Sequence, residues 1–364
     1  MAFFEGIDRN FGFGFMRLPM IGDNVDIEQT KKMVDLFLEQ GFRYFDTAHG
    51  YINGKSELAL RECLTSRYPR DRYILTNKLS SYLFETEDQI RPLFQQQLEA
   101  CGVDYFDFYL MHAQNHTTFE KYKKVHAYEV ALELKKEGKI RHMGISFHDT
   151  AEVLDQILTE YPQIEVVQIQ FNYVDFEDDK VQSRKCYKVC RKHGKPVIVM
   201  EPVKGGSLVN LPTDAQAVFD ALGGGSNASY AIRFAAGFEG IMMVLSGMSS
   251  LEQMQDNLNF MKDFHPLSSE ERAAVDKVGQ IFREKVIVPC TGCRYCTEVC
   301  PNGIAIPDLF ARLNAKRLLK PLELYPINGE LPSACVKCGQ CEGECPQNLP
   351  IRELLETAAK ELNL

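Results

Sequence analysis

Short apolar runs alternate with amphipathic segments along most of the chain. The runs resemble β-strands because they are brief, rich in aromatic and aliphatic residues, and in several cases apolar throughout, as is typical of strands buried on both faces. Strands are therefore predicted at residues 12–18, 44–47, 73–77, 106–111, 142–147, 166–171, 196–200 and 241–246.

The intervening segments carry apolar residues at helical spacing, and the first ends at Gly41, a residue that favours a helix C-terminus. Eight strand–helix units predict an α/β protein with a closed (β/α)8 barrel, the TIM barrel. No G-x-G-x-x-G opens a helix, so the dinucleotide fingerprint of an open sheet is missing. Helices are predicted at residues 27–40, 56–67, 87–100, 119–137, 150–159, 180–193, 228–237 and 251–263.

Two cysteine runs follow this pattern, and each has the spacing C-x2-C-x2-C-x3-C-P. This is the spacing of cubane iron–sulfur clusters, and in two-cluster proteins the fourth cysteine of each run serves the other cluster. Two [4Fe–4S] clusters are therefore predicted. The expected ligands are Cys290, Cys293, Cys296 and Cys345 for one cluster, and Cys335, Cys338, Cys341 and Cys300 for the other.

Structural zinc and a disulfide framework are the alternatives for these cysteines. Zinc usually takes two separated C-x2-C pairs, and disulfides need an oxidising compartment. The first five residues begin no charged-then-apolar export signal, so we expect a reducing cytoplasmic setting. The runs resemble those of bacterial-type dicluster ferredoxins. The helical pattern at 306–319 is more similar to the α-helical ferredoxin modules of multisubunit oxidoreductases.

Two domains are expected, a barrel at residues 1–283 and a small, mainly helical cluster domain at residues 284–364. The net charge is −9 without a long basic run, which argues against nucleic acid or an anionic membrane surface as partner. The longest apolar stretches are too short to span a bilayer. We therefore predict a cytoplasmic protein that binds neither nucleic acid nor membrane.

Polar residues stand where predicted strands end, which is where a TIM barrel carries its catalytic groups. Asp46, Lys78 and His112 each close a strand, and Tyr51 follows Asp46 by five residues. In order and approximate spacing, this set resembles the catalytic tetrad of the aldo-keto reductases. With the two cysteine runs appended, the chain is similar to the iron–sulfur-containing members of that family. The alternative is a structural Asp46–Lys78 ion pair, with Tyr51 as a packing residue.

The resemblance implies an oxidoreductase that interconverts a carbonyl and an alcohol of a small molecule. An isolated phenol titrates near pH ~10, and a neighbouring ammonium such as that of Lys78 favours its phenolate. Tyr51 is then expected to protonate the carbonyl oxygen as hydride reaches the carbon. Asp46 is expected to hold Lys78 in place, and His112 to orient the carbonyl by a hydrogen bond.

The resemblance also implies a nicotinamide cofactor, NAD(P)(H). Gly247 and Gln253 occupy positions where relatives carry basic residues for the 2′-phosphate of NADP, so NAD is favoured. An asparagine that follows the fifth-strand serine in ordinary members is replaced by Phe147 after Ser146. The expected cofactor-binding residues are Met16, Arg17, Asp46, Ser146, Gln168, Glu201, Gly205, Gly206, Ser246, Gly247, Gln253 and Asn257.

Hydride transfer moves two electrons, whereas each cluster passes one, and a flavin is the usual converter. We therefore expect a ferredoxin-like electron carrier as partner or a bound FMN or FAD. A flavin phosphate is expected on the loops after the last two strands, at residues 204–207 and 246–247. Two other hypotheses stay open: a plain NAD(P)H-dependent carbonyl reductase with structural clusters, and a non-catalytic electron-transfer subunit.

Overall fold

The computed structural model describes residues 3–286 and 288–364. The predicted absence of an export signal depends partly on Met1 and Ala2, which lie outside the described residues. In the described ranges, no helix is long and apolar enough to cross a membrane.

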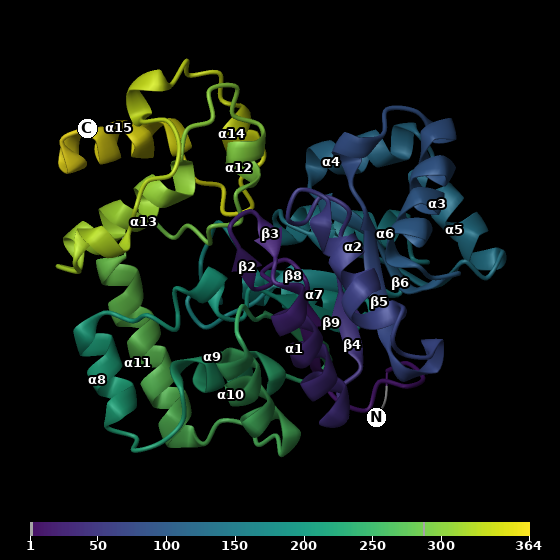
Figure 1. Ribbon diagram of the computed structural model, residues 1–364, viewed down its shortest axis with the longest axis horizontal. Coiled ribbons are helices and arrows are strands. Elements are labelled where there is room, and N and C mark those ends of the chain that lie inside the picture. The colour runs from purple at the N-terminus through teal and green to yellow at the C-terminus, as the bar shows by residue number, and fades with distance from the viewer. Residues whose placement is uncertain (1–2, 287) are drawn as a thin grey trace. The chain divides into compact units, whose positions relative to one another are not determined.

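Eight parallel strands close into a barrel, which confirms the predicted TIM fold (Figure 1). Neighbouring strands follow the order β1-β10-β9-β8-β7-β6-β5-β4, and β4 pairs back with β1. The strands are β1 Phe11–Gly14, β4 Tyr44–Asp46, β5 Ile74–Leu79, β6 Phe106–Gln114, β7 Ile140–Phe147, β8 Val166–Gln170, β9 Val197–Met200 and β10 Ile241–Gly247.

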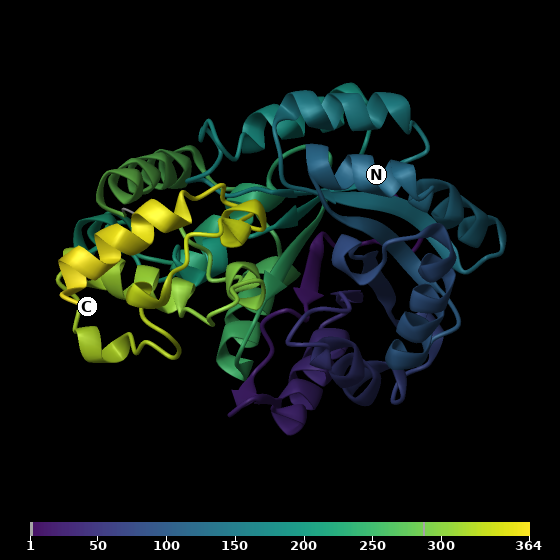
Figure 2. The same ribbon diagram turned by 90° about the horizontal axis from the view of Figure 1, so that it is seen from above.

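Helices follow the strands and cover the barrel from outside, as α3, α4 and α5 do in Figure 1 and again in the view from above in Figure 2. A short hairpin, β2 Met20–Ile21 with β3 Asn24–Val25, precedes the first helix. The helices up to β10 are α1 Ile27–Glu39, α2 Lys55–Leu60, α3 Ile90–Cys101, α4 His116–Lys124, α5 Ala127–Lys136, α6 Ala151–Glu160, α7 Ser183–Lys192, α8 Thr213–Asp220 and α9 Asn227–Ala236.

The helix predicted at 119–137 is two helices, α4 and α5. His126 lies between them with a φ of 51°, in the left-handed region that a continuous helix cannot contain. The apolar pattern continues through this corner, because Tyr122 and Ala127 are both buried. The helical period alone therefore did not predict the break.

Large apolar side chains from most of the barrel strands form one buried cluster. Tyr44, Phe108, Ile198, Met243 and Leu245 belong to this buried cluster. Burying each such side chain contributes about 1.5–3 kcal/mol. The interior is thus a packed core, and the polar residues are left for the strand ends.

The chain divides into two compact units. One contains the barrel strands and comprises the described residues up to Asn172, with Gln182–Pro202 and Ile232–Leu267. The other comprises Tyr173–Val181, Val203–Ala231 and Ser268–Leu364. The predicted domain boundary at residue 283 stays a prediction, because these units follow spatial contacts and interleave along the chain.

The second unit, here called the cluster unit, is mainly helical. Its α13 packs against α15, its α12 lies beside α14, and α11 packs against α8. Buried apolar residues such as Leu309, Phe310 and Leu355 form its core, which also includes Cys296 and Cys341. The remaining helices are α10 Leu251–Lys262, in the barrel unit, and α11 Ser269–Lys285, α12 Tyr295–Glu298, α13 Ile306–Arg317, α14 Gln340–Gly343 and α15 Ile351–Leu362 in the cluster unit.

Candidate active site and cluster sites

Three of the predicted tetrad residues lie at the carboxyl ends of neighbouring strands. Asp46 ends β4, Lys78 lies one residue before the end of β5, and His112 lies near the end of β6. Because parallel strands of a barrel all end at the same mouth, the fold places these side chains on one face.

Lys78 and Asp46 form a buried ion pair at this mouth. The Nζ of Lys78 lies 2.6 Å from Oδ1 of Asp46 and donates a second hydrogen bond of 2.9 Å to the carbonyl oxygen of Thr47. Burial lowers the pKa of Lys78 and raises the pKa of Asp46, and the attraction between the two charges opposes both shifts. Asp46 thus favours the charged ammonium of Lys78 against the burial that lowers its pKa.

Tyr51 reaches the same place from the loop after β4. The Nζ of Lys78 lies 4.8 Å from the centre of the Tyr51 ring, and the His112 ring lies 5.9 Å from it, edge to face. Ile52 and Asn53 follow with φ values of 54° and 53°. Positive φ is unfavourable for a β-branched residue such as Ile52, and strain of this kind gathers at functional loops.

His112 is buried and is held by a serine that the sequence reasoning missed. Its Nδ1 lies 2.6 Å from Oγ of Ser80. Burial lowers the pKa of His112 well below its usual value, and the nearby charge of Lys78 adds to this. The imidazole is therefore neutral at physiological pH. Ser80 follows Lys78 by two positions, so alternation along an extended chain was the one available signal.

A second missed group packs behind Lys78. The buried carboxyl of Glu57 accepts hydrogen bonds from Nδ2 of Asn77, at 2.8 Å, and from Nδ1 of His49, at 2.7 Å. The Gln97 amide reaches the Lys78 carbonyl oxygen at 2.9 Å. Glu57 thus links His49, two residues before Tyr51, to Asn77, which precedes Lys78.

Two buried acceptors at the barrel strands have no hydrogen-bond partner within the described part of the chain. They are Oδ2 of Asp46 and Oε1 of Gln168. Buried polar atoms are nearly always hydrogen-bonded, so these two oxygens call for donors from a bound molecule. Ser146 pairs with Gln168 across β7 and β8, and its Oγ accepts the N–H of Ala113, the residue after His112.

The predicted cofactor residues near the ends of β1, β9 and β10 contact neighbouring residues of the barrel unit. Met16 and Arg17 lie in the turn after β1, and the side chain of Arg17 lies against Gly247 and 3.4 Å from the carboxylate of Glu201. The amide of Asn257 donates to Oγ of Ser246 at 3.1 Å, and Oε1 of Gln253 accepts the N–H of Ser249 at 2.8 Å.

The remaining two predicted cofactor residues, Gly205 and Gly206, belong to the cluster unit. Gly205 has a φ of 64°, and a Cβ there would clash with the carbonyl oxygen of Thr291. The N–H groups of Gly206 and Ser207 already donate to the carbonyl oxygens of Val203 and Lys204. The other predicted cofactor residues belong to the barrel unit.

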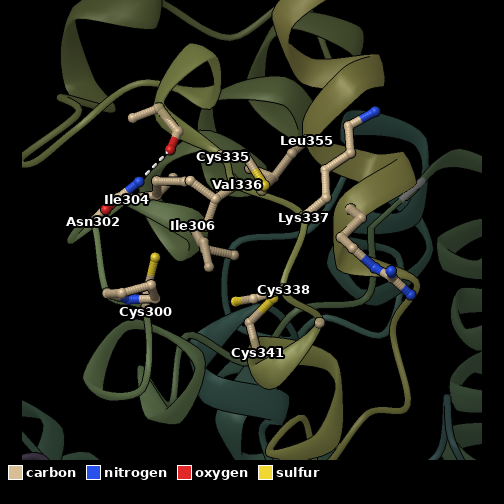
Figure 3. Close-up of a pocket in the computed structure, with 14 residues that line it drawn as sticks. Cys300, Asn302, Ile304, Ile306, Cys335, Val336, Lys337, Cys338, Cys341 and Leu355 are labelled. Carbon is tan, nitrogen blue, oxygen red and sulfur yellow. Dashed lines mark hydrogen bonds between the residues drawn. The ribbon is translucent and has the colours of Figure 1, made fainter.

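The eight clustered cysteines line two separate cavities of the cluster unit. The Cys338 cavity, drawn in Figure 3, is lined by Cys300, Cys335, Cys338 and Cys341. The Cys345 cavity is lined by Cys290, Cys293, Cys296 and Cys345. In each cavity, three cysteines come from one run and the fourth comes from the other run. This is the crossed grouping expected of a two-cluster domain.

The chemistry of these cysteines suits a polynuclear cluster. Burial raises the pKa of Cys296, and repulsion from Cys293, Cys290 and Cys345 raises it further. Such cysteines favour the protonated thiol when nothing is bound, and a bound cationic cluster core favours the thiolate instead. Among the described residues, no group of three or more His, Cys, Asp or Glu side chains converges as the ligands of one metal ion do. The quartets surround cavities instead.

Comparison with known proteins identifies both parts of the chain. The aldo/keto reductase family model matches residues 10–280, more than half of the chain. The chain belongs to the aldo/keto reductase family. A 4Fe-4S dicluster domain model matches residues 289–349. This aldo/keto reductase is therefore an oxidoreductase with a C-terminal dicluster domain, as predicted.

Its relatives are distant. The NADH-specific methylglyoxal reductase of Escherichia coli (strain K12) is 26% identical over 200 residues, which cover 50% of the chain and only 59% of that protein. An aldo-keto reductase of Mycolicibacterium vanbaalenii is 29% identical over 269 residues, covering 71% of the chain and 88% of that protein. A solved aldo-keto reductase of Bacillus halodurans, in its holo form, matches with a TM-score of 0.59 and 25% identity, covering 74% of the chain and 91% of that structure.

Proposed function

We propose that this aldo/keto reductase interconverts a small-molecule carbonyl and its alcohol with Tyr51 as the proton donor, and that two [4Fe–4S] clusters relay electrons. The observation that carries the catalytic part is the buried ammonium of Lys78, fixed by Asp46 at 2.6 Å and placed 4.8 Å from the Tyr51 ring. Solvent does not screen that charge, and only the Asp46 carboxylate offsets part of its effect on the phenol.

The four side chains have distinct roles in this proposal. The ammonium of Lys78 favours the phenolate of Tyr51, which makes the phenol a ready proton donor to a carbonyl oxygen. Asp46 keeps Lys78 charged and in place. His112 is neutral, and when Ser80 donates to its Nδ1, its Nε2 carries the hydrogen that orients the carbonyl.

A nicotinamide cofactor supplies or accepts the hydride in this reaction when bound. The orphan acceptors fit such a group, because Gln168 can accept from a carboxamide N–H and Asp46 from a ribose hydroxyl. Ser146 lies near the end of β7 and Ser246 near the end of β10, and Asn257 lies on α10, the helix that follows β10. Arg17 is faced by the carboxylate of Glu201, and Gln253 is uncharged, which favours NAD over the additional phosphate of NADP.

The two cysteine quartets are proposed as the ligands of the two clusters. Cys338 is exposed, whereas each cysteine of the other quartet is buried or partly buried. A cluster in the Cys338 cavity is therefore open to an external partner, and we propose a ferredoxin-like carrier as that partner. This assignment gives the relay an outer and an inner member.

The loop expected to bind a flavin phosphate does not fit that group. Two of its backbone donors, in Gly206 and Ser207, are already used within the loop, and Gly205 packs against Thr291. The proposed reaction therefore uses no FMN or FAD, and the clusters exchange single electrons with the ferredoxin-like partner. Extraction of a flavin from purified protein would reopen that route.

The test uses protein purified without oxygen and loaded with about eight irons. We expect carbonyl turnover with NADH, loss of that turnover in Tyr51→Phe, and bleaching of the cluster absorbance by a reduced ferredoxin. Full turnover by Tyr51→Phe would overturn the catalytic proposal and favour a non-catalytic electron-transfer subunit. If no donor bleaches the clusters while turnover persists, the plain reductase with structural clusters is correct.

A further inference from the structure

A buried lysine of the cluster unit has no place in the proposed reaction. Lys204 is 0% exposed, and its Nζ lies 2.6 and 2.8 Å from the two carboxylate oxygens of Asp175. A third contact of 3.1 Å joins Nζ to Oε1 of Gln347. Enclosing an ion pair removes water from both charges at a cost in free energy, so this arrangement requires an explanation beyond stability.

Gln347 connects this lysine to the Cys345 cavity. It follows Cys345 by two residues and lines the same cavity. The backbone N–H groups of Leu349, Gln347 and Asn348 are directed at the sulfur of Cys345. The side chain of Gln347 is therefore anchored by Lys204 while its backbone faces a proposed ligand sulfur.

The amide of Gln347 is also oriented by this contact. An ammonium group only donates hydrogen bonds, so the amide atom next to Lys204 is the oxygen and the NH2 group points away from it. Lys204 thus fixes both the position and the direction of a dipole that lines the cavity.

The neighbouring residue makes a second contact with the same site. Gly205 approaches the carbonyl oxygen of Thr291 so closely that no Cβ could be accommodated. Thr291 lies between Cys290 and Gly292, and the N–H of Gly292 donates to Sγ of Cys290 at 3.3 Å. The segment Lys204–Gly205 therefore contacts the cysteine loops of both runs that meet at this cavity.

Reduction adds one negative charge to a cluster that its four thiolates already make anionic. Burial opposes that step, whereas N–H groups directed at the sulfurs and nearby positive charge favour it. The cations beside the other cavity differ, because the side chains of Lys337 and Arg352 are 68% and 46% exposed and are screened by water. Lys204 is not screened in this way.

We propose that Lys204, acting through Gln347, is a positioning residue that raises the reduction potential of the cluster in the Cys345 cavity. Asp175 offsets part of the charge of the ammonium and fixes its location, so most of the effect comes from the anchored Gln347 loop. This inference rests on the two clusters of the proposed function.

The test is an anaerobic redox titration of the full chain followed by EPR, which resolves one-electron reduction of the two clusters. In Lys204→Met, we expect one cluster to become harder to reduce by about tenfold in equilibrium constant, which is about 59 mV for a one-electron couple. Lys204→Arg retains the charge and should recover part of the shift. Lys337→Met, beside the other cavity, is the matched control and should leave the affected cluster unchanged.

Lys204→Met alone could fail to assemble, so Gln347→Leu provides a second variant that keeps the ion pair and removes only the amide anchor. It should shift the same cluster in the same direction. The inference is overturned if an assembled Lys204→Met moves neither cluster or both equally, or if Gln347→Leu moves neither. A wild-type protein that shows no cluster reduction at all would instead refute the relay in the proposed function.

Discussion

Lys78 and Asp46 form an ion pair that is buried at the mouth of the barrel, with 2.6 Å between Nζ and Oδ1. Desolvating two charges in this way is often no more stabilising than an apolar pair of the same volume. The arrangement is therefore better explained by its neighbour, because Tyr51 lies within reach of the ammonium and at the edge of His112. The charge of Lys78 is therefore explained by its effect on Tyr51 and not by a contribution to the stability of the fold.

Lys78→Met is predicted to abolish turnover and to destabilise the fold. It leaves the Asp46 carboxylate buried without a counter-charge, which costs about 3–5 kcal/mol. The double variant Asp46→Asn with Lys78→Met should recover much of that free energy of unfolding, yet stay at least about 10²-fold below wild type in turnover. Chemical denaturation and steady-state kinetics separate the two effects. A double variant that regained activity would contradict the role of Lys78.

His112 is predicted to make the protein less stable as the pH falls below about 6.5. Its pKa is lowered by burial in the folded state, so between that value and the unfolded value of about 6.5 only the unfolded chain binds the proton. Stability is therefore lost as the pH falls, by about 1 kcal/mol at pH 5.5 relative to pH 7.5.

The measurement for this prediction is urea unfolding of the wild type and of His112→Asn at both pH values. The asparagine cannot titrate, so its free energy of unfolding should fall by about 1 kcal/mol less between the two pH values. An equal change in the free energy of unfolding between the two pH values in both proteins would show that His112 is not held neutral.

Glu57→Gln is predicted to destabilise the barrel by about 1–3 kcal/mol, because the new amide N–H2 would face a donor of Asn77 or His49 inside the network. Thermal unfolding measures the change. Glu62→Gln is the control, since the exposed Glu62 side chain pairs with the partly exposed Lys31, and its effect should be about 0.5 kcal/mol or less. A similar loss in both variants would contradict the network.

The sequence predicted most of the fold because strand length and apolar content are local signals. It also predicted which strand ends carry Asp46, Lys78 and His112, since spacing along the chain locates them. Ser80 and Gln347 were missed for different reasons. Ser80 directly follows β5, and its partner His112 comes from the neighbouring strand. The contact between Gln347 and Lys204 spans 143 residues with no periodicity to reveal it.

The same limit applies to the loop after β9. The flavin site was predicted there because the loops after the last two strands are a common anion site in TIM barrels. In the structure, Gly205 serves close packing against Thr291 instead. A glycine pair allows either a ligand or another backbone segment to come close, and only the three-dimensional contacts show which of the two does.

Cys338→Ser is predicted to lower the iron content from about eight to about four atoms per chain while leaving carbonyl turnover with NADH largely intact. Cys338 is the exposed member of its quartet, so a serine there adds no buried hydroxyl and spares the core of the cluster unit. Cys186→Ser is the control, because Cys186 is a buried barrel thiol that lines neither cavity, and it should keep about eight irons. Iron analysis and cluster absorbance of protein purified without oxygen provide the measurement.

Retention of eight irons by Cys338→Ser would contradict the ligand assignment. If carbonyl turnover were lost together with one cluster, the cluster in the Cys338 cavity would take part in the reaction itself, because the barrel contains the whole of the proposed Tyr51 chemistry.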